Sequence, residues 1–333
     1  MSAEASTPAA PARRMRIDLH VWGPLVALVL LILLGAFLNA NFLSYGNVTN
    51  VLARSAFIGI IAVGMTFVIT AGGLDLSVGS MAAFIAGVMI IVMNWLVPEL
   101  GAGWPVVLAG MGAALLVGLV AGAVNGLLVT RAGIEAFIVT LGTMGIFRSL
   151  VTWLADGGTL SLNFEVREVY RPVYYGGLFG VAWPIVVFAV IAVIGEIVMR
   201  RTAFGRHCAA IGSNDQVARY SAIHVDTVRL LTYVFLGILV GIATIMYVPR
   251  LGSASSTTGL LWELEAIAAV IIGGTVLKGG FGRVWGTAVG VLILSLIDNI
   301  LNLTDLVSPY LNGAIQGVII ILAVVLQRGR KAG

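Results

Sequence analysis

The sequence predicts an all-α, polytopic membrane protein with about ten transmembrane helices. Apolar residues make up 59% of its 333 residues and charged residues only 10%, whereas a soluble domain carries roughly 25% charged residues. Runs such as Val21–Ala40, Ala56–Ala71 and Trp104–Thr130 contain no ionisable side chain, and about 20 apolar helical residues suffice to cross a hydrocarbon core. Many of the 42 glycines lie inside such runs, where small residues let helices pack closely in a bilayer.

The apolar segments predict the spans in chain order. They are about 21–40, 50–71, 80–97, 104–130, 135–155, 183–199, 229–248, 264–278, 284–302 and 309–327. Residues 1–20, rich in Ala, Pro and Ser, predict a disordered cytoplasmic tail; residues 21–328 predict a single transmembrane domain, and residues 329–333 a second tail. Arginines before the first apolar run are also typical of a signal peptide, but this run is longer than a signal core and further spans follow it. We therefore expect an uncleaved first helix.

The basic residues predict the orientation, because cytoplasmic loops of membrane proteins are enriched in Lys and Arg. With a cytoplasmic N-terminus, the inner loops and tails hold 14 of the 19 basic residues: Arg13, Arg14, Arg16, Arg131, Arg200, Arg201, Arg206, Arg219, Arg229, Lys278, Arg283, Arg328, Arg330 and Lys331. The outer loops keep Arg167, Arg171 and Arg250, while Arg54 and Arg148 lie within spans. The sequence thus predicts a multi-pass plasma-membrane protein with both termini in the cytoplasm.

Two connecting loops are longer than a simple turn requires, and long loops often carry function. In the inner loop, residues 200–229, Asn214 or Asp215 can cap a helix formed by Gln216–Ile223. Such a surface helix is suited to dock a cytoplasmic partner; the alternative is an interfacial helix that stabilises only this chain. The outer loop, Asp156–Trp183, is either a functional surface or a connection within an aromatic belt.

Two glycine-rich joints share one pattern, which hints at an internal duplication of the kind found in transporters. GGLDLSVGS spans Gly72–Ser80 and GGFGRVWGT spans Gly279–Thr287. Each has Gly-Gly, five residues, then Gly and a small hydroxyl residue. The glycines either permit tight packing and left-handed backbone angles or form hinges along a transport path. The candidate hinge residues are Gly72, Gly73, Ser77, Gly79, Gly279 and Gly280.

Polar residues inside the predicted membrane region form a second group of candidates, because such residues are unfavourable there unless they are paired or solvated. Asp75 lies in the first joint and either caps the helix that begins near Ser77 or contacts a partner or a transport path. The others are Asn125, Arg148, Asp298, Asn299 and Asn302. These residues either line a polar cavity or hydrogen-bond one helix to another.

The sequence also excludes several classes of function. Its single cysteine, Cys208, and its three histidines, which form no HExxH pattern, allow no internal disulfide and no recognisable metal site. No GxxxxGK[ST] phosphate loop is present, since GGTVLKGG at 273–280 lacks the Gly-Lys-hydroxyl ending. We expect no catalytic residue, no metal, no cofactor bound by this chain and no nucleic-acid partner. Without a phosphate loop the chain cannot hydrolyse ATP alone, so a transporter built from it would take energy from another subunit. The alternative is an autonomous secondary carrier or facilitator.

Four sequence blocks resemble the permease subunits of bacterial ABC importers for ribose, xylose, arabinose, galactose and related monosaccharides. They are NVTNVLARSAFIGIIAVGMTFVITAGGLDLSVGS (47–80), AFIVTLGTMGIFRSL (136–150), FGRHCAAIGSNDQVARYSAI (204–223) and WELEAIAAVIIGGTVLKGGFGRVWGT (262–287). The resemblance covers about Asn47–Leu326. It implies an ABC importer permease fold of ten helices in the bacterial inner membrane, surrounded by membrane lipid and moving a monosaccharide or related polyol by alternating access.

The resemblance also implies partners and a coupling site. Two permease copies would sit on two ABC ATPase subunits, which bind ATP and Mg, and a periplasmic sugar-binding protein would deliver cargo near loops 156–182 and 249–263. The implied ATPase-coupling residues are Asn214, Asp215, Gln216, Val217, Ala218, Arg219, Tyr220, Ser221, Ala222 and Ile223. This sequence departs from the family pattern at Glu135 and Ala136, where proline is common, and at Ser213, Tyr220, Ala222 and Glu265.

Overall fold

The computed structural model describes residues 19–304 together with 311, 313–315, 317–318 and 321, and these residues are mainly helical. Within this part of the chain, seven helices are long and apolar enough to cross a membrane. They are α2 (Tyr45–Thr70), α3 (Val78–Leu100), α4 (Trp104–Thr130), α5 (Ala136–Leu154), α8 (Trp183–Arg201), α11 (Val225–Leu251) and α13 (Val284–Thr304). The prediction of a mainly helical, multi-pass membrane protein is confirmed.

The predicted number of about ten spans is not confirmed. The first predicted span coincides with α1 (Leu19–Leu38). The eighth, 264–278, is wrong as a span, because α12 (Trp262–Ile272) has only 11 residues and at 1.5 Å per residue covers about half of a hydrocarbon core. The tenth, 309–327, lies mostly outside the described residues, as do most of the two predicted tails.

Local sequence explains where the long helices begin and end. The Ser44 side chain accepts a hydrogen bond from the N–H of Asn47 and so caps α2. Proline stands in the first turn of α4 and of α8, where its missing N–H leaves no intrahelical hydrogen bond unmade. Helix α11 ends at Gly252, which has a left-handed backbone conformation (φ 66°) that glycine adopts without strain.

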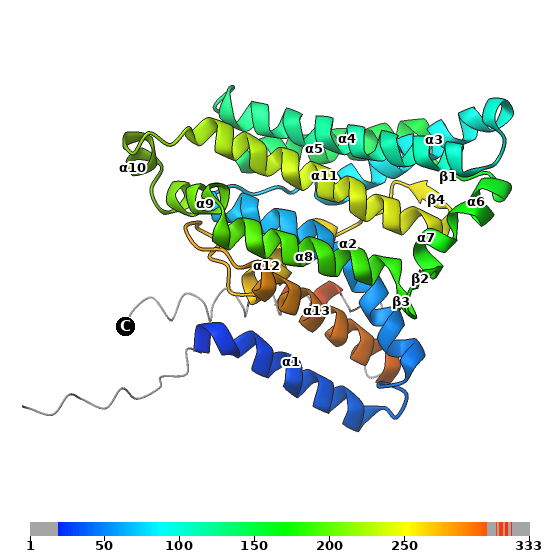
Figure 1. Ribbon diagram of the computed structural model, residues 1–333, viewed down its shortest axis with the longest axis horizontal. Coiled ribbons are helices and arrows are strands. Elements are labelled where there is room, and N and C mark those ends of the chain that lie inside the picture. Colours follow the sequence, from blue (N-terminus) through cyan, green and yellow to red (C-terminus); the bar gives the residue numbers. More distant parts are fainter. Residues whose placement is uncertain (1–18, 305–310, 312, 316, 319–320, 322–333) are drawn as a thin grey trace, which may run out of the picture.

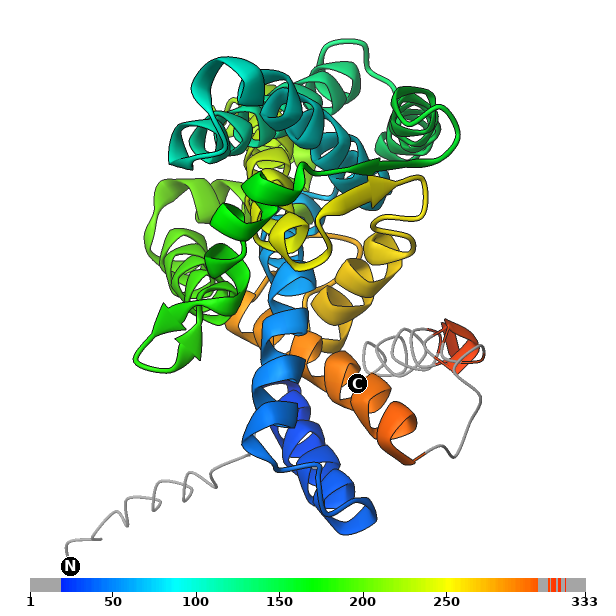
Figure 2. The same cartoon turned by 90° about the vertical axis from the view of Figure 1, so that its right-hand side faces the viewer.

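Helix α2 lies at the centre of the bundle, in contact with α8, α11, α12 and α13 (Figures 1 and 2). Every residue from Gly59 to Thr70 is buried. Helices α4 and α11 lie side by side and meet through glycines: a Cβ on Gly237 would lie only 3.0 Å from the Cα of Gly122. Such close backbone contact is the packing that small residues allow in a membrane.

The two ends of the bundle differ in structure. At one end lie α9 (Ala203–Ser213) and α10 (Asp215–Tyr220), and at the other lie the short elements of loops 156–182 and 249–263 (Figure 1). These are β1 (Thr159–Ser161), α6 (Phe164–Tyr170), α7 (Pro172–Tyr175), β2 (Gly177–Leu178), β3 (Val181–Ala182) and β4 (Ser253–Ser255).

The strands correct the all-α prediction, although they are short. β1 pairs antiparallel with β4, placing Thr159 opposite Ser255, and β2 pairs with β3 as a hairpin. Strand pairing therefore joins two loops, 156–182 and 249–263, that are about a hundred residues apart in the sequence. The Tyr170 hydroxyl also donates a hydrogen bond to the Ile245 carbonyl (2.7 Å) and ties α6 to α11.

Candidate functional site

Helix α10 begins at a side-chain cap. The side-chain oxygen of Asn214, which separates α9 from α10, accepts a hydrogen bond from the N–H of Val217 at 3.0 Å. Asp215 occupies the first turn, where a negative charge is favoured by the helix dipole. The helix ends at Tyr220, earlier than the predicted Gln216–Ile223, because Ala222 takes a left-handed conformation (φ 59°).

The end of α10 gives a first testable prediction. A left-handed conformation is unfavourable for a residue with a Cβ, whereas glycine adopts it readily. We expect Ala222→Gly to stabilise this end by up to about 1 kcal/mol, seen as slower hydrogen exchange of the α10 amides. The matched control, Ala218→Gly inside the same helix, should accelerate exchange. Faster exchange in Ala222→Gly would contradict the assigned backbone conformation.

Four charged side chains link α10 to the rest of the molecule, and we call them the ionic chain. Arg219 contacts Asp226 on α11 at 2.7 Å and Asp215 at 3.5 Å, and Arg229 contacts Asp215 at 3.4 Å. The Arg229 Nε donates to the carbonyl of Ala71, at the first glycine joint, at 3.5 Å. The hydrogen bond to Asp226 raises the pKa of Arg219, so the guanidinium stays charged. These contacts connect α10 to α11 and to this joint.

The exposed face of α10 carries two large side chains. Tyr220 is 89% exposed and Val217 is 57% exposed. Aromatic side chains such as that of Tyr220 are enriched at protein interfaces. The predicted docking segment thus presents a surface suited to a groove on another protein.

The two glycine joints contact one another and the end of α9. A Cβ on Gly279 would lie 2.9 Å from the Cα of Gly212 and 3.0 Å from the Cα of Gly72. Gly280 donates its N–H to the carbonyl of Thr70 (3.0 Å). Gly72, Gly279 and Gly280 have φ values of 79°, 88° and 86°, which favour glycine. The joints form one three-part contact, which we call the glycine junction (Gly72, Gly212, Gly279 and Gly280), directly beside the ionic chain.

Three predicted polar candidates form a cluster behind this junction. Asp75, Ser77 and Asn125 are fully buried. One carboxylate oxygen of Asp75 accepts from the N–H and hydroxyl of Ser77, at 2.8 and 2.6 Å, and the other accepts from the Asn125 amide at 3.2 Å. The turn before α3 is therefore hydrogen-bonded to α4. Because Asp75 has no exposed surface, it lies out of reach of a docked protein. Gly73 belongs to the same turn, where a Cβ would meet the Tyr233 hydroxyl at 2.8 Å.

The remaining candidates lie elsewhere in the fold. A Cβ on Gly79 would collide with the Gly259 carbonyl in the loop before α12. Arg148 on α5 donates to the Ser256 and Thr258 carbonyls of that loop, at 2.5 and 2.6 Å. Asn299 on α13 exchanges hydrogen bonds with Asn47 on α2, at 2.8 and 2.9 Å. It therefore bonds one helix to another, which was one of the two roles expected for these polar residues. Asp298, its neighbour, is partly buried.

Sequence reasoning missed Glu196, which lies on α8 and caps another helix. Its Oε2 accepts hydrogen bonds from the N–H groups of Val284 (2.9 Å) and Trp285 (3.1 Å) at the start of α13, and its Oε1 contacts Arg200 at 2.7 Å. A carboxylate at a helix N-terminus also stabilises the helix dipole. The signal available in the sequence was a single acidic residue in an otherwise apolar run, but its partner could not be read from the sequence.

Removing this cap gives a second testable prediction. We expect Glu196→Ala to lower the free energy of unfolding by about 1–2 kcal/mol, seen as a lower melting temperature in detergent. Arg200→Ala removes only the exposed ion pair and should lower stability by about 0.5 kcal/mol or less. Equal melting of Glu196→Ala and wild type would contradict the capping role.

Metal chemistry finds no support in the described residues, which contain no group of three or more His, Cys, Asp and Glu side chains able to hold a metal. The sole cysteine is buried on α9, and this burial raises the pKa of the Cys208 thiol to about 12. The thiol is therefore protonated, and weakly nucleophilic, at neutral pH. The described residues form a connected set instead: the exposed helix α10 contacts the ionic chain, and the ionic chain adjoins the glycine junction.

Comparison with known proteins shows the family of the chain. Residues 47–324 match a family described as branched-chain amino acid transport system / permease component. The chain belongs to this permease family. The permease is 33% identical over 300 residues to the ribose import permease protein of Haemophilus influenzae, covering 90% of each chain. It is 37% identical over 317 residues to that of Bacillus subtilis, covering 93% of each.

Two further comparisons agree. The permease is 31% identical over 374 residues to the xylose transport system permease protein of Escherichia coli, covering 95% of this chain and 93% of that one. A solved structure described as a metal-chelate type ABC transporter in an inward-facing conformation shares the fold, with a TM-score of 0.51, 12% identity, and coverage of 92% of this chain and 98% of that one. The predicted resemblance to monosaccharide permeases is therefore confirmed.

Proposed function

We propose that the permease is the membrane subunit of an ATP-driven importer that moves a monosaccharide or related polyol into the cytoplasm by alternating access. The names of its relatives, ribose and xylose permeases, support the class of substrate. The absence of a phosphate loop from the sequence supports a separate ABC ATPase subunit as the source of energy. The permease would work in the bacterial inner membrane with both termini in the cytoplasm.

The observation that carries this proposal is the ionic chain between α10 and the first glycine joint. In the proposed mechanism, α10 fits a groove on the ATPase through Tyr220 and Val217, which are exposed. ATP-driven closure of the ATPase pair moves α10, and the contacts of Arg219 and Arg229 pass the movement to α11 and to Ala71. Glycines in the junction then allow the backbone there to change conformation.

The opposite end of the bundle supports a periplasmic docking surface. Pairing of β1 with β4 makes loops 156–182 and 249–263 one surface, and the hydrogen bonds from Arg148 to Ser256 and Thr258 tie that surface to α5. A sugar-binding protein seated there could release cargo above α5 and α12. A second permease copy would complete the path, and affinity for sugar would reside mainly in the binding protein.

Reconstitution tests the proposal. Proteoliposomes containing the permease, its ATPase subunit and a co-encoded binding protein should take up radiolabelled ribose or xylose only when ATP is supplied on the α10 side. A permease whose ATPase subunit carries an inactive phosphate loop is the matched control and should show no uptake. Equal uptake without the ATPase would contradict the proposal and support an autonomous carrier.

A further inference from the structure

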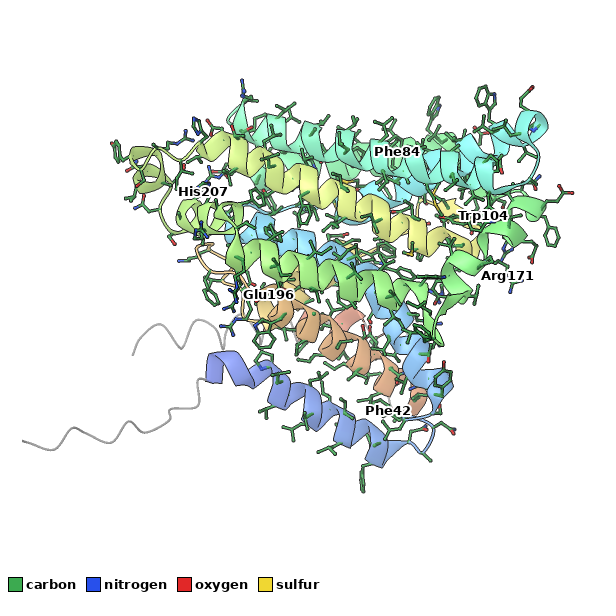
Figure 3. The ribbon with its side chains drawn as sticks, in the orientation of Figure 1. Phe42, Phe84, Trp104, Arg171, Glu196 and His207 are labelled. Carbon is green, nitrogen blue, oxygen red and sulfur yellow. The ribbon has the colours of Figure 1, made fainter. Side chains whose placement is uncertain are left out.

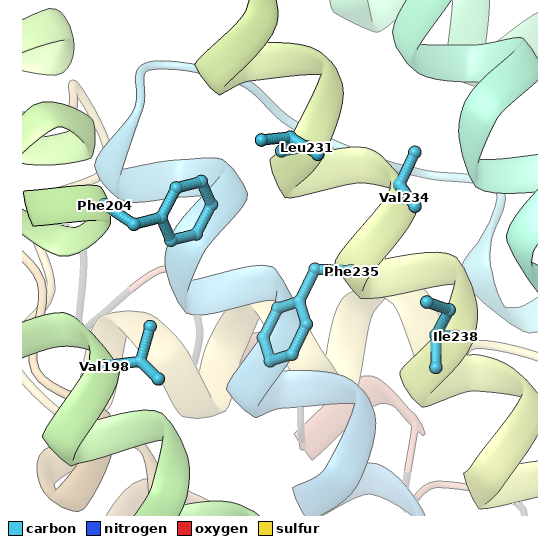
Figure 4. Close-up of a pocket in the computed structure, with 6 residues that line it drawn as sticks. All are labelled: Val198, Phe204, Leu231, Val234, Phe235 and Ile238. Carbon is cyan, nitrogen blue, oxygen red and sulfur yellow. The ribbon is translucent and has the colours of Figure 1, made fainter. Parts of the chain in front are cut away.

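An apolar groove opens on the surface of the bundle between α8, α9 and α11 (Figure 4). It is lined by Val198, Phe204, Leu231, Val234, Phe235 and Ile238 and has a volume of about 340 Å³, within the range of roughly 300–1,000 Å³ of small-molecule sites. Every lining side chain is hydrocarbon, so nothing in the groove could fix the hydroxyl groups of a sugar. The groove suits an extended hydrocarbon chain.

The rim of the groove at the α10 end carries unneutralised positive charge. Arg201 follows Val198 by three residues on α8, so the two side chains share a helix face. Arg200 is neutralised by Glu196 at 2.7 Å. By contrast, Arg201 has no carboxylate within ion-pair distance in the described part of the chain. Glu196 on α8 and His207 on α9 mark this end in Figure 3.

The start of α9 lies at the same rim, and its first turn lacks a side-chain cap. The hydroxyl of Thr202, the residue before α9, donates to the Val198 carbonyl at 2.7 Å instead of accepting from the helix. Phe204, in that first turn, lines the groove. Backbone N–H groups at the start of a helix favour a phosphate, and here they adjoin both Arg201 and the hydrocarbon surface.

From this geometry we propose that the groove binds one anionic phospholipid, with an acyl chain between α8 and α11 and the phosphodiester against Arg201 and the first turn of α9. Basic pockets between membrane helices at a membrane face bind anionic headgroups in this way. The apolar groove accounts for the chain and the unneutralised rim accounts for the charge. This site is independent of the proposed transport function, because it requires only that the helices span a bilayer.

Native mass spectrometry of the purified permease tests the site, with dioleoyl phosphatidylglycerol as the anionic probe and dioleoyl phosphatidylethanolamine as the zwitterionic one. Wild type should retain one phosphatidylglycerol in preference to phosphatidylethanolamine. Arg201→Gln should weaken phosphatidylglycerol binding about fivefold and remove the preference. Added inorganic phosphate should not displace the lipid, because phosphate alone gains nothing from the groove.

A second variant fills the groove without changing charge. Val234→Phe should weaken binding of both lipids, whereas the matched control Val120→Phe, at a half-exposed position on α4, should bind as wild type does. Melting temperatures would show that each variant is folded. The proposal is overturned if folded Arg201→Gln and Val234→Phe retain phosphatidylglycerol as wild type does, or if Val120→Phe loses it equally.

Discussion

Replacing Arg219 with alanine is expected to reduce ATP-dependent uptake at least about fivefold, because coupling free energies between sites correspond to roughly 5- to 150-fold effects. The guanidinium holds Asp226 of α11 at 2.7 Å and Asp215 of α10 at 3.5 Å. Both contacts are about half exposed and screened by water, so their loss should change stability little. The measurement is sugar uptake by proteoliposomes, together with the rate of ATP hydrolysis and the amount of ATPase subunit that copurifies with the permease.

Two further variants separate coupling from general damage. Arg171→Ala breaks a comparable exposed pair, Arg171–Glu168 at 3.3 Å, at the opposite end of the bundle, and should leave copurification of the ATPase unchanged. The charge exchange Arg219→Asp with Asp226→Arg should restore part of the uptake lost in Arg219→Asp alone. Uptake at the wild-type level in Arg219→Ala would show that the ionic chain does not transmit movement.

Gly212→Ala is expected to have the largest effect on stability. A Cβ there would overlap the Thr70 carbonyl and the Gly280 N–H, which lie closer than any van der Waals contact allows. Both obstacles are backbone atoms, so no side chain can rotate away, and the junction must open. Overpacking of this kind costs about 1–3 kcal/mol. We expect a lower melting temperature and loss of transport.

The matched control is Gly112→Ala on α4, where a Cβ would meet no atom within 4 Å. Alanine favours helix more than glycine does, so this variant should melt at or above the wild-type temperature. If Gly212→Ala has the same melting temperature as Gly112→Ala, the close approach of the two joints to α9 is wrong.

Much of the fold could be predicted because membrane spans are encoded locally, in apolar runs of sufficient length. The error at 264–278 has a physical cause. Hydropathy continues through Val276 and Leu277, but the chain leaves the helix at Gly273, and Gly274 takes a positive φ of 91°. The Gly-Gly pair was visible in the sequence; its helix-ending role was not, because similar glycines lie inside α4 and α11 without interrupting them.

The candidate site could be predicted only in its local part. Asn214 and Asp215 predict a helix start because short polar side chains cap helix N-termini, and the structure places the start of α10 there. By contrast, the contact of Gly72 with Gly279 joins two segments that have the same glycine pattern but lie far apart in the sequence. The Asn47–Asn299 pair likewise depends on the packing of α2 against α13. Such contacts come from tertiary structure, and no local pattern specifies them.

Accessibility of Tyr220 tests most directly whether α10 faces the cytoplasm and holds the ATPase. Tyr220 is 89% exposed, so Tyr220→Cys offers a reactive thiol, while the pKa of about 12 keeps the buried Cys208 thiol unreactive. A membrane-impermeant maleimide should label Tyr220→Cys in inverted vesicles, not in right-side-out vesicles, and bound ATPase should block the labelling. Labelling from the periplasmic side, or labelling that the ATPase does not reduce, would contradict the account.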